Sequence, residues 1–315
     1  MTTSAKHLKT DHTSEAYQTH NDLSLDLRLV FPVHGIIGIL LMSTSWYLSW
    51  MRPEGFTFIW ENAFFPLWFG YILVVDGLNV LLKGNSLFTR NSKAFWGLFI
   101  ASIFCWWLFE FLNLFLNNWV YVLNRPVGPL EYAIRSSINF SIVTPAVFET
   151  AELLSSSKPL SLIRKKQSAP LSMTIVTRNL FIGIVWLVLV IGFPRYAFPL
   201  AWGAIFLIID VINYLNNAPS IHGEWAKGER RIIWSLALGS LICGFFWEMW
   251  NYFSIPKWIY KVPFVDFYHV FEMPILGFIG YLPFGLEVFA LYFFVMYAFG
   301  FKKTAFWDSE QYIRL

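Results

Sequence analysis

Long apolar stretches are the feature that most limits how this 315-residue chain can fold. A helix needs about 17 to 25 mostly apolar residues to cross a hydrocarbon core roughly 30 Å thick. Eight such stretches recur, without the apolar and polar alternation of a barrel strand, and therefore predict membrane-spanning helices. They run approximately from Val30 to Met51, Phe64 to Leu82, Phe95 to Leu116, Ile138 to Leu154, Ile175 to Phe193, Phe198 to Leu215, Ile232 to Phe253 and Pro274 to Tyr297.

Composition points to the same fold class. Hydrophobic residues make up 57% of the chain and charged residues 14%, whereas about a quarter of a soluble domain is charged. We therefore predict an all-α, polytopic membrane protein with about eight transmembrane helices. Residues 1–28 are polar and lack the pattern of a cleaved signal, so we expect the first apolar helix to remain as an anchor.

The distribution of positive charge predicts the orientation. Eight spans place both termini on one side, and most of the 23 Lys and Arg residues, including Arg164-Lys165-Lys166, fall in segments on that side. The positive-inside rule then makes both termini cytoplasmic, in a plasma (inner) membrane. The topology explains the formal net charge of +3, because the excess positive charge lies beside anionic lipid head groups. We therefore expect the lipid bilayer, and no nucleic acid, as a partner.

The chain also repeats itself, which indicates a tandem duplication. An offset of 138 residues aligns the third span with the seventh, and one residue of slippage then aligns the outer segments beyond them, after which the offset of 138 returns. The second and sixth spans correspond as well. The matched pairs include Cys105 and Cys243, Glu110 and Glu248, Asn113 and Asn251, Trp119-Val-Tyr121 and Trp258-Ile-Tyr260, Pro145 and Pro283, Glu149 and Glu287, Asp76 and Asp210, and Asn79 and Asn213.

Each copy holds four spans, so both copies have the same orientation, and a pseudo-two-fold axis along the membrane normal follows. The predicted organisation has five parts. These are a cytoplasmic tail (1–28), a first four-helix repeat (29–154), a basic cytoplasmic linker (155–172), a second four-helix repeat (173–299) and a second cytoplasmic tail (300–315).

Acidic side chains inside the spans are the candidate functional groups. A charged residue at the centre of a bilayer costs about 2.5 kcal/mol or more on insertion scales, so such residues need partners or must be neutral. An Asn three residues after an acid lies on the same helix face, and we expect these faces to line a shared polar interior. Two interpretations stay open: interhelical bridges worth about 0.6 to 2 kcal/mol each, or a functional site.

A carboxyl group in a dry, aromatic-lined pocket can remain protonated and suits protonation of an isoprenoid alkene or epoxide, with ring faces stabilising the carbocation. The chain has no phosphate-binding loop, zinc-protease motif or Asp-rich diphosphate motif. Asp266, His269 and Glu272 could hold a metal, but the first copy has no counterpart. We expect neither a metal nor a cofactor.

The second copy carries an ordered set of residues, Glu248, Asn251, Trp258, Tyr260, then Gly280-Tyr281-Leu282-Pro283 and Glu287. This set resembles the integral-membrane lycopene cyclase domain, a family that also has tandem membrane repeats. The repeat pattern as a whole also resembles multi-pass bacterial membrane proteins without an assigned function. The chain departs from the cyclase pattern in having one Glu where that family has paired carboxylates, and about four spans per unit instead of three.

The resemblance implies a cofactor-independent, acid-initiated cyclisation of an isoprenoid-like molecule. Glu149 and Glu287 would be proton donors, and Glu110 and Glu248 would stabilise the cation. The expected substrate-binding residues are Asn113, Asn251, Trp119, Tyr121, Trp258, Tyr260, Asp76 and Asp210.

Two rival functions remain at this point. The same carboxyl groups could relay protons or cations in a transporter or channel, or they could only bridge helices in a scaffold. A cyclase predicts a mostly apolar, aromatic-lined cavity, whereas a transporter predicts a polar path toward both faces. A scaffold predicts no cavity beside the acids.

Overall fold

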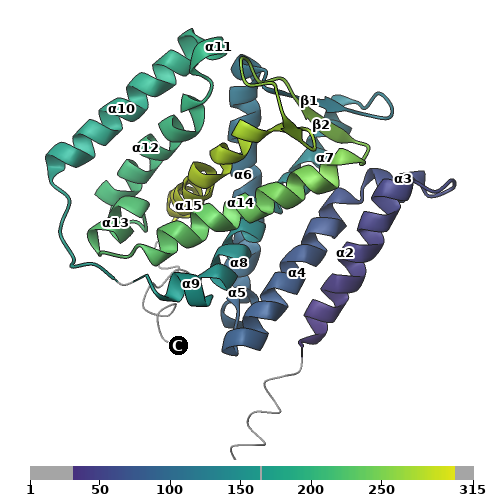
Figure 1. Cartoon of the computed structure of the whole chain (residues 1–315), viewed down its shortest axis with the longest axis horizontal. Helices are drawn as coiled ribbons and strands as arrows, with labels where there is room; N and C mark the ends of the chain where they lie inside the picture. Colours follow the sequence, from purple (N-terminus) through teal and green to yellow (C-terminus); the bar gives the residue numbers. More distant parts are fainter. Residues whose placement is uncertain (1–30, 164, 302–315) are drawn as a thin grey trace, which may run out of the picture.

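The structure is a computed structural model that describes residues 31–163 and 165–301, so the predicted tail 1–28 and residues 302–315 of the second tail lie outside it (Figure 1). The described chain is helical apart from two small two-stranded sheets. Its first half contains α2 (Val33–Met51), α3 (Thr57–Glu61), α4 (Phe64–Lys83), α5 (Leu87–Arg90), α6 (Ser92–Leu116), β1 (Trp119–Val122), α7 (Pro129–Phe140), α8 (Val143–Ser155) and α9 (Lys158–Ser161). Its second half contains α10 (Met173–Gly192), α11 (Pro194–Ala197), α12 (Leu200–Leu215), α13 (Ile221–Ala226), α14 (Arg231–Tyr252), β2 (Lys257–Tyr260), β3 (His269–Val270), β4 (Met273–Pro274), the 3₁₀ helix η1 (Ile275–Gly280) and α15 (Tyr281–Ala298).

The helical fold class is confirmed, and several helices have the length and composition of membrane spans. Five segments qualify, namely α4, α6, α10, α14 and the continuous stretch Ile275–Ala298. Of the other predicted spans, α2 has 19 residues, α12 has 16 and α8 has 13, and none of these three belongs to that group. The count of eight spans therefore stays a prediction.

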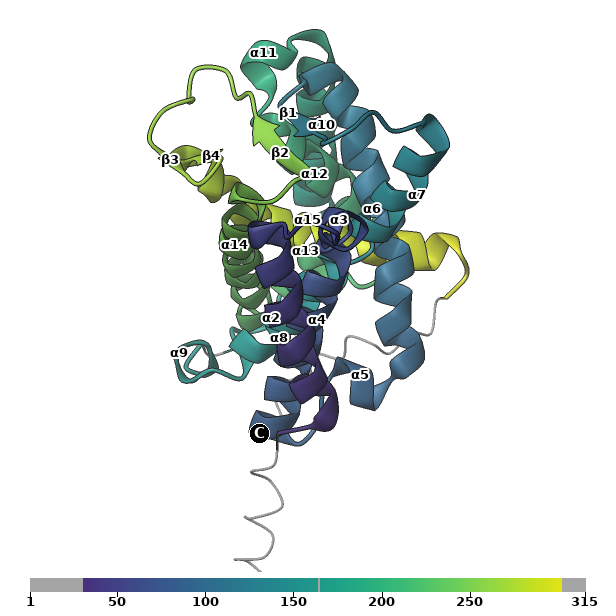
Figure 2. The same cartoon turned by 90° about the vertical axis from the view of Figure 1, so that its right-hand side faces the viewer.

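The helices form a bundle with two distinct ends. In Figure 1 the short helices α5 and α9 lie at one end, and β1, β2 and α3 lie at the other. The view in Figure 2 separates the same elements. Helix α2 packs along α4 on one flank and α10 packs along α12 on the other, while α8 contacts α14 in the middle.

Glycines allow α2 and α4 to touch through their backbones. A Cβ atom added to Gly38 would lie 2.7 Å from the carbonyl oxygen of Gly70, and one added to Gly70 would lie 2.6 Å from the amide nitrogen of Met42. On the opposite flank, a Cβ atom on Gly183 would lie 3.2 Å from the carbonyl oxygen of Ala204. Close packing of small residues is typical of membrane helix pairs, which otherwise gain little from hydrophobic burial.

The predicted fourth span, Ile138–Leu154, is wrong as a single helix because the chain breaks between α7 and α8. Ser102 of α6 stabilises the break, since its Oγ donates to the carbonyl of Phe140 (2.5 Å) and accepts from the amide of Thr144 (3.0 Å). Pro145, which has no N–H to offer, sits in the first turn of α8, where none is needed. In the second half η1 likewise precedes α15, with Pro283 in its first turn.

Candidate functional site

The two Trp-x-Tyr segments pair with each other. Strands β1 and β2 are antiparallel, with Trp119 opposite Tyr260 and Tyr121 opposite Trp258. Each Trp therefore faces the Tyr of the other segment, as a local two-fold axis between the strands requires. This pairing joins the two halves at the end of the bundle that carries α3 (Figure 1).

An Asn on the preceding helix holds each strand in place. The Nδ2 of Asn113 donates to the carbonyl of Trp119 at 2.9 Å, and its Oδ1 accepts from the amide of Asn118 at 2.9 Å. In the second half, Asn251 donates to the carbonyl of Trp258 at 2.8 Å and accepts from the same residue's amide at 2.9 Å. Because the backbone uses both amide side chains, these residues position the strands.

Glu110 lies behind β1 and accepts two hydrogen bonds on one oxygen. The hydroxyl of Tyr121 donates to Oε1 at 2.6 Å, and the indole nitrogen of Trp119 donates to the same atom at 3.1 Å. The motif that the sequence singled out is thus one hydrogen-bonded unit.

Glu248 has the corresponding place behind β2 but has two tyrosine partners. Its Oε1 accepts from Tyr260 at 2.8 Å and from Tyr281 at 2.6 Å, while the Trp258 indole donates to the Tyr260 hydroxyl at 3.0 Å. Glu248 is fully buried, and its Oε2 has no hydrogen-bond partner among the described residues. A carboxyl group that accepts on one oxygen only is well suited to carry a proton on the other.

The tyrosines of the two strands, Tyr121 and Tyr260, keep their hydroxyl protons. Burial, reinforced by the neighbouring Glu248 carboxyl, holds the pKa of Tyr260 well above its ordinary value. Burial and Glu110 raise the pKa of Tyr121 in the same way. Both hydroxyls therefore stay protonated at physiological pH and keep donating to the glutamates.

A cavity of about 250 Å³ lies against these strands. Nearly half of the residues in its wall are aromatic. Arg135 and Lys257 also line it, and each is paired with an acid, Glu61 and Glu272 respectively. The lining residues are Glu61, Phe64, Trp106, Asn118, Trp119, Tyr121, Leu123, Val127, Tyr132, Arg135, Ser136, Asn139, Phe140, Val143, Phe198, Trp202, Trp247, Pro256, Lys257, Trp258, Tyr260, Val262, Met273, Gly277, Gly280, Tyr281 and Phe284.

Four of the predicted site residues line this cavity, namely Trp119, Tyr121, Trp258 and Tyr260, and Glu110 and Glu248 stand directly behind them. Glu287 is fully buried on α15, one turn after the lining residue Phe284, and neither of its oxygens has a partner among the described residues.

Glu149, Asp76 and Asp210 lie elsewhere. Asp76 accepts from the amide of Phe88 at 3.1 Å, and Asp210 accepts from the amides of Ile221 and His222 at 2.7 and 2.8 Å. These contacts tie α4 to α5 and α12 to α13. Helix α5 lies at the end of the bundle opposite the strands (Figure 1).

The outer loop does not gather its three candidate metal ligands. His269 Nε2 lies 2.8 Å from Asp266 Oδ1, but Glu272 pairs with Lys257 instead. Within residues 31–163 and 165–301, no group of three or more His, Cys, Asp or Glu side chains is arranged to hold a metal ion.

Tyr281 is the main site residue that the sequence did not single out. It belongs to Gly280-Tyr281-Leu282-Pro283, but its counterpart in the first half is Val143, so comparison of the two copies gave it no weight. The lining residues Trp106, Trp202 and Trp247 come from three different helices and share no motif.

No protein-family model, curated protein or solved structure gives a significant match to this chain. The resemblance to the lycopene cyclase domain therefore remains a prediction.

Proposed function

We propose that the cavity binds an apolar, isoprenoid-like molecule and that the protein catalyses its acid-initiated, cofactor-independent cyclisation. The observation that carries this proposal is a cavity rich in aromatic residues and lined by three tyrosines, Tyr121, Tyr260 and Tyr281. Their hydroxyl groups donate hydrogen bonds to Glu110 or Glu248 behind the cavity wall. Aromatic faces stabilise a cation, and a protonated carboxyl behind tyrosine hydroxyls supplies the acid.

The step is balanced without any further reactant. In the reacting arrangement the acid proton of Glu248 faces the Tyr281 oxygen and the Tyr281 hydroxyl turns toward the substrate. Tyr281 then gives its hydroxyl proton to a terminal alkene carbon and receives the one from Glu248, leaving a tertiary carbocation and a carboxylate. A neighbouring double bond attacks the cation and closes the ring. Loss of a proton from the adjacent carbon returns it through Tyr281 to Glu248, so the product is an isomer of the substrate.

The assignment of the acid differs from what the resemblance implies. That resemblance makes Glu149 and Glu287 the proton donors, but of the four glutamates only Glu110 and Glu248 bond to residues of the cavity wall. We assign the acid to Glu248 because it has two tyrosine links to the cavity and Glu110 has one.

The size of the cavity suggests which part of the substrate enters. Pockets for drug-sized ligands usually enclose about 300 to 1,000 Å³, so about 250 Å³ suits a compact group such as one ring or a short prenyl end. A longer polyene would place only its end group there, with the rest of the molecule in the surrounding apolar phase.

Matched contacts in the two halves support the tandem duplication that we include in this proposal. Ser86 caps α5 and Ser220 caps α13, and Asp76 and Asp210 bond to the backbone of those two helices. The crossing of α2 and α4 at Gly38 has its counterpart where α10 crosses α12 at Gly183, although the sequence comparison did not align the first and fifth spans.

The test is expression of the whole chain in a host that makes linear polyprenoids, followed by comparison of extracted lipids. We expect an isomeric cyclic product from the wild type and about 100-fold or more less from Glu248→Gln, because general acid catalysis contributes roughly 10² to 10⁴. Glu149→Gln is the matched control, since it also neutralises a buried acid but lies away from the cavity.

Two results would overturn the proposal. One is unchanged lipids in a host that makes the wild-type protein in quantity. The other is a cyclic product that survives Glu248→Gln but disappears with Glu149→Gln, which would return the acid role to the residue that the family resemblance implies.

A further inference from the structure

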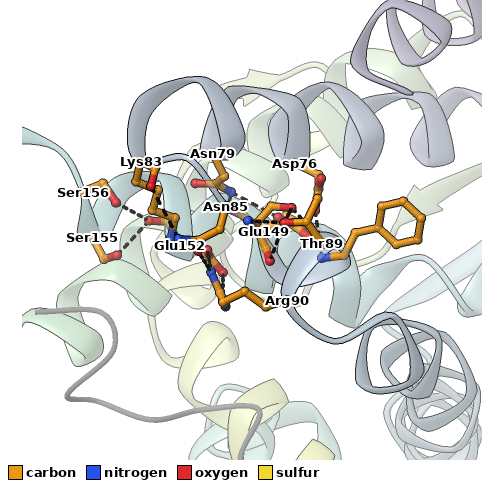
Figure 3. Close-up of polar contacts among 12 residues, drawn as sticks. Asp76, Asn79, Lys83, Asn85, Thr89, Arg90, Glu149, Glu152, Ser155 and Ser156 are labelled. Atoms are coloured by element: carbon orange, nitrogen blue, oxygen red, sulfur yellow. Dashed lines mark hydrogen bonds and ion pairs between the residues drawn. The ribbon is translucent and has the colours of Figure 1, made fainter. Parts of the chain in front are cut away.

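A second buried polar cluster lies toward the end of the bundle that carries α5 (Figure 3). Helix α4 contributes Asp76 and Asn79, and helix α8 contributes Glu149 and Glu152. Asp76, Asn79, Glu149 and Glu152 are all completely buried. None of them lines the aromatic cavity, so the proposed reaction leaves the cluster unexplained.

Asp76 has partners suited to a carboxylate. Its Oδ2 accepts from the amide of Phe88 at 3.1 Å. Its Oδ1 lies 2.9 Å from Nε2 of His34 on α2, outside hydrogen-bond geometry. A backbone donor thus satisfies one oxygen of this carboxyl group, and the imidazole lies beside the other.

Glu149 has a different environment. Asn79 Nδ2 donates to its Oε2 at 3.1 Å and to its main-chain carbonyl at 3.2 Å. The carboxyl groups of Glu149 and Asp76 lie next to each other (Figure 3). Oε1 of Glu149 is buried and has no donor among the described residues, and the same holds for Oδ1 of Asn79. Two carboxyl groups can share a hydrogen bond only when one of them carries a proton.

Glu152, one turn further along α8, is held by cations. Lys83 forms an ion pair with its Oε1, and Arg90 donates to both oxygens, at 2.7 and 2.9 Å. Such a bidentate pair fixes Glu152 as a carboxylate. The positive charge of Lys83 and Arg90 is thereby directed to Glu152, and Glu149 has no cation among its hydrogen-bond partners.

We propose that Asp76 and Glu149 form a proton-binding site that holds one proton between two carboxyl groups. The charged and titratable groups facing it are His34 from α2, Lys83 from α4, Arg90 from α5 and Glu152 from α8, while α14 presents the thiol of Cys243 near Thr150. With one proton on the pair and His34 neutral, these charges sum to zero; the sum is the same with both carboxyl groups ionised and His34 protonated. We assign the proton to the carboxyl pair because the contact between His34 and Asp76 lacks the hydrogen-bond geometry that a charged imidazole would adopt.

The site belongs to the first half alone. At the corresponding place in the second half, Asp210 binds His222, with Nδ1 and Oδ2 2.5 Å apart, and Asn213 donates to the carbonyl of Ala290 at 2.8 Å. Ala290 stands where Glu152 stands in the first half. His34, whose side chain is 22% exposed, is the member through which the proton can exchange with the surroundings, because an imidazole can both accept and donate a proton.

Infrared titration of the purified full-length protein tests this inference, which does not depend on the proposed cyclase activity. The C=O stretch of a neutral carboxyl is separate from that of a carboxylate. Starting from the double variant Glu248→Gln, Glu287→Gln, which removes the proposed acid and the other buried acid without a partner, we expect one neutral-carboxyl signal at neutral pH that is lost when Glu149→Gln is added. The matched variant Glu152→Gln should keep it, because Glu152 is already ionised.

Asp76→Asn is the second variant, and we expect the signal to weaken at least several-fold, because an amide at this position donates to Glu149 and leaves no proton to be shared. The inference is wrong if the signal persists in both Glu149→Gln and Asp76→Asn, or if Glu152→Gln removes it. Thermal unfolding of each variant shows whether it is folded, and the isosteric replacements preserve the shape of the site.

Discussion

Glu110 and Glu248 occupy matching positions, yet their hydrogen bonds differ because of one residue. Tyr281 supplies the second hydroxyl at Glu248, and Val143 takes its place in the first half. Glu110 receives the Trp119 indole instead. A tyrosine hydroxyl can both donate and accept a hydrogen bond and so can relay a proton, whereas an indole N–H can only donate a hydrogen bond. Glu248 therefore has more routes than Glu110 for passing a proton to the cavity.

Substitution of Tyr281 and Tyr121 separates these roles. We expect Tyr281→Phe to reduce product formation about tenfold or more, because it breaks the link between Glu248 and the cavity, whereas Tyr121→Phe should have a smaller effect. Both proteins should fold, since each loses one hydroxyl, worth about 1 kcal/mol. Product yield per amount of membrane protein is the measurement, and equal losses in the two variants would argue against the asymmetry.

At the scale of elements, contact between α2 and α4 depends on Gly70. We expect Gly70→Ala to lower stability by about 1 to 3 kcal/mol, because the new methyl group would lie 2.6 Å from a backbone atom of α2. Gly97→Ala is the control, since its nearest neighbour, the Met296 methyl group, is 3.6 Å away. Thermal denaturation in detergent compares them, and a fall in Tm for Gly97→Ala as large as that for Gly70→Ala would refute the explanation.

The antiparallel register of β1 and β2 can be trapped by a disulfide. Val122 is paired with Lys257, so the double variant Val122→Cys, Lys257→Cys should cross-link on mild oxidation, as directly opposed residues have Cα atoms within disulfide range. Val122→Cys with Ile259→Cys is offset by two residues and should cross-link poorly. Gel mobility after proteolysis between the strands reports the bond, and a reversed preference would mean a different register.

The sequence predicted which residues form the paired strands and their supporting acids better than it predicted how the two strands are arranged. The acid, the Asn three residues later and Trp-x-Tyr recur in the same order, with one residue more before Trp-x-Tyr in the second half, and each set forms one hydrogen-bonded unit. That the two Trp-x-Tyr segments pair with each other could not be predicted, because strand pairing depends on residues far apart in the chain. Likewise, the break before α8 depends on Ser102 of another helix, which apolar periodicity does not reveal.

At the scale of the whole molecule, three long helices, α10, α12 and α14, separate Ser168 from Tyr268 along the chain. Three crossings of the membrane would place these two residues on opposite sides of it. Both side chains are exposed. If each of the three helices crosses the bilayer, we expect a cysteine at position 168 to react with a membrane-impermeant maleimide only from the cytoplasm, and one at position 268 only from the other side.

Helix α12 makes this a demanding test. Its 16 residues span about 24 Å, less than the roughly 30 Å hydrocarbon core, so it can cross only if α11 or a locally thinned bilayer makes up the difference. Labelling of both positions from one side would show that one of α10, α12 and α14 does not cross. The second half would then have fewer crossings than the four predicted, and the prediction of two equivalent four-span repeats would be wrong.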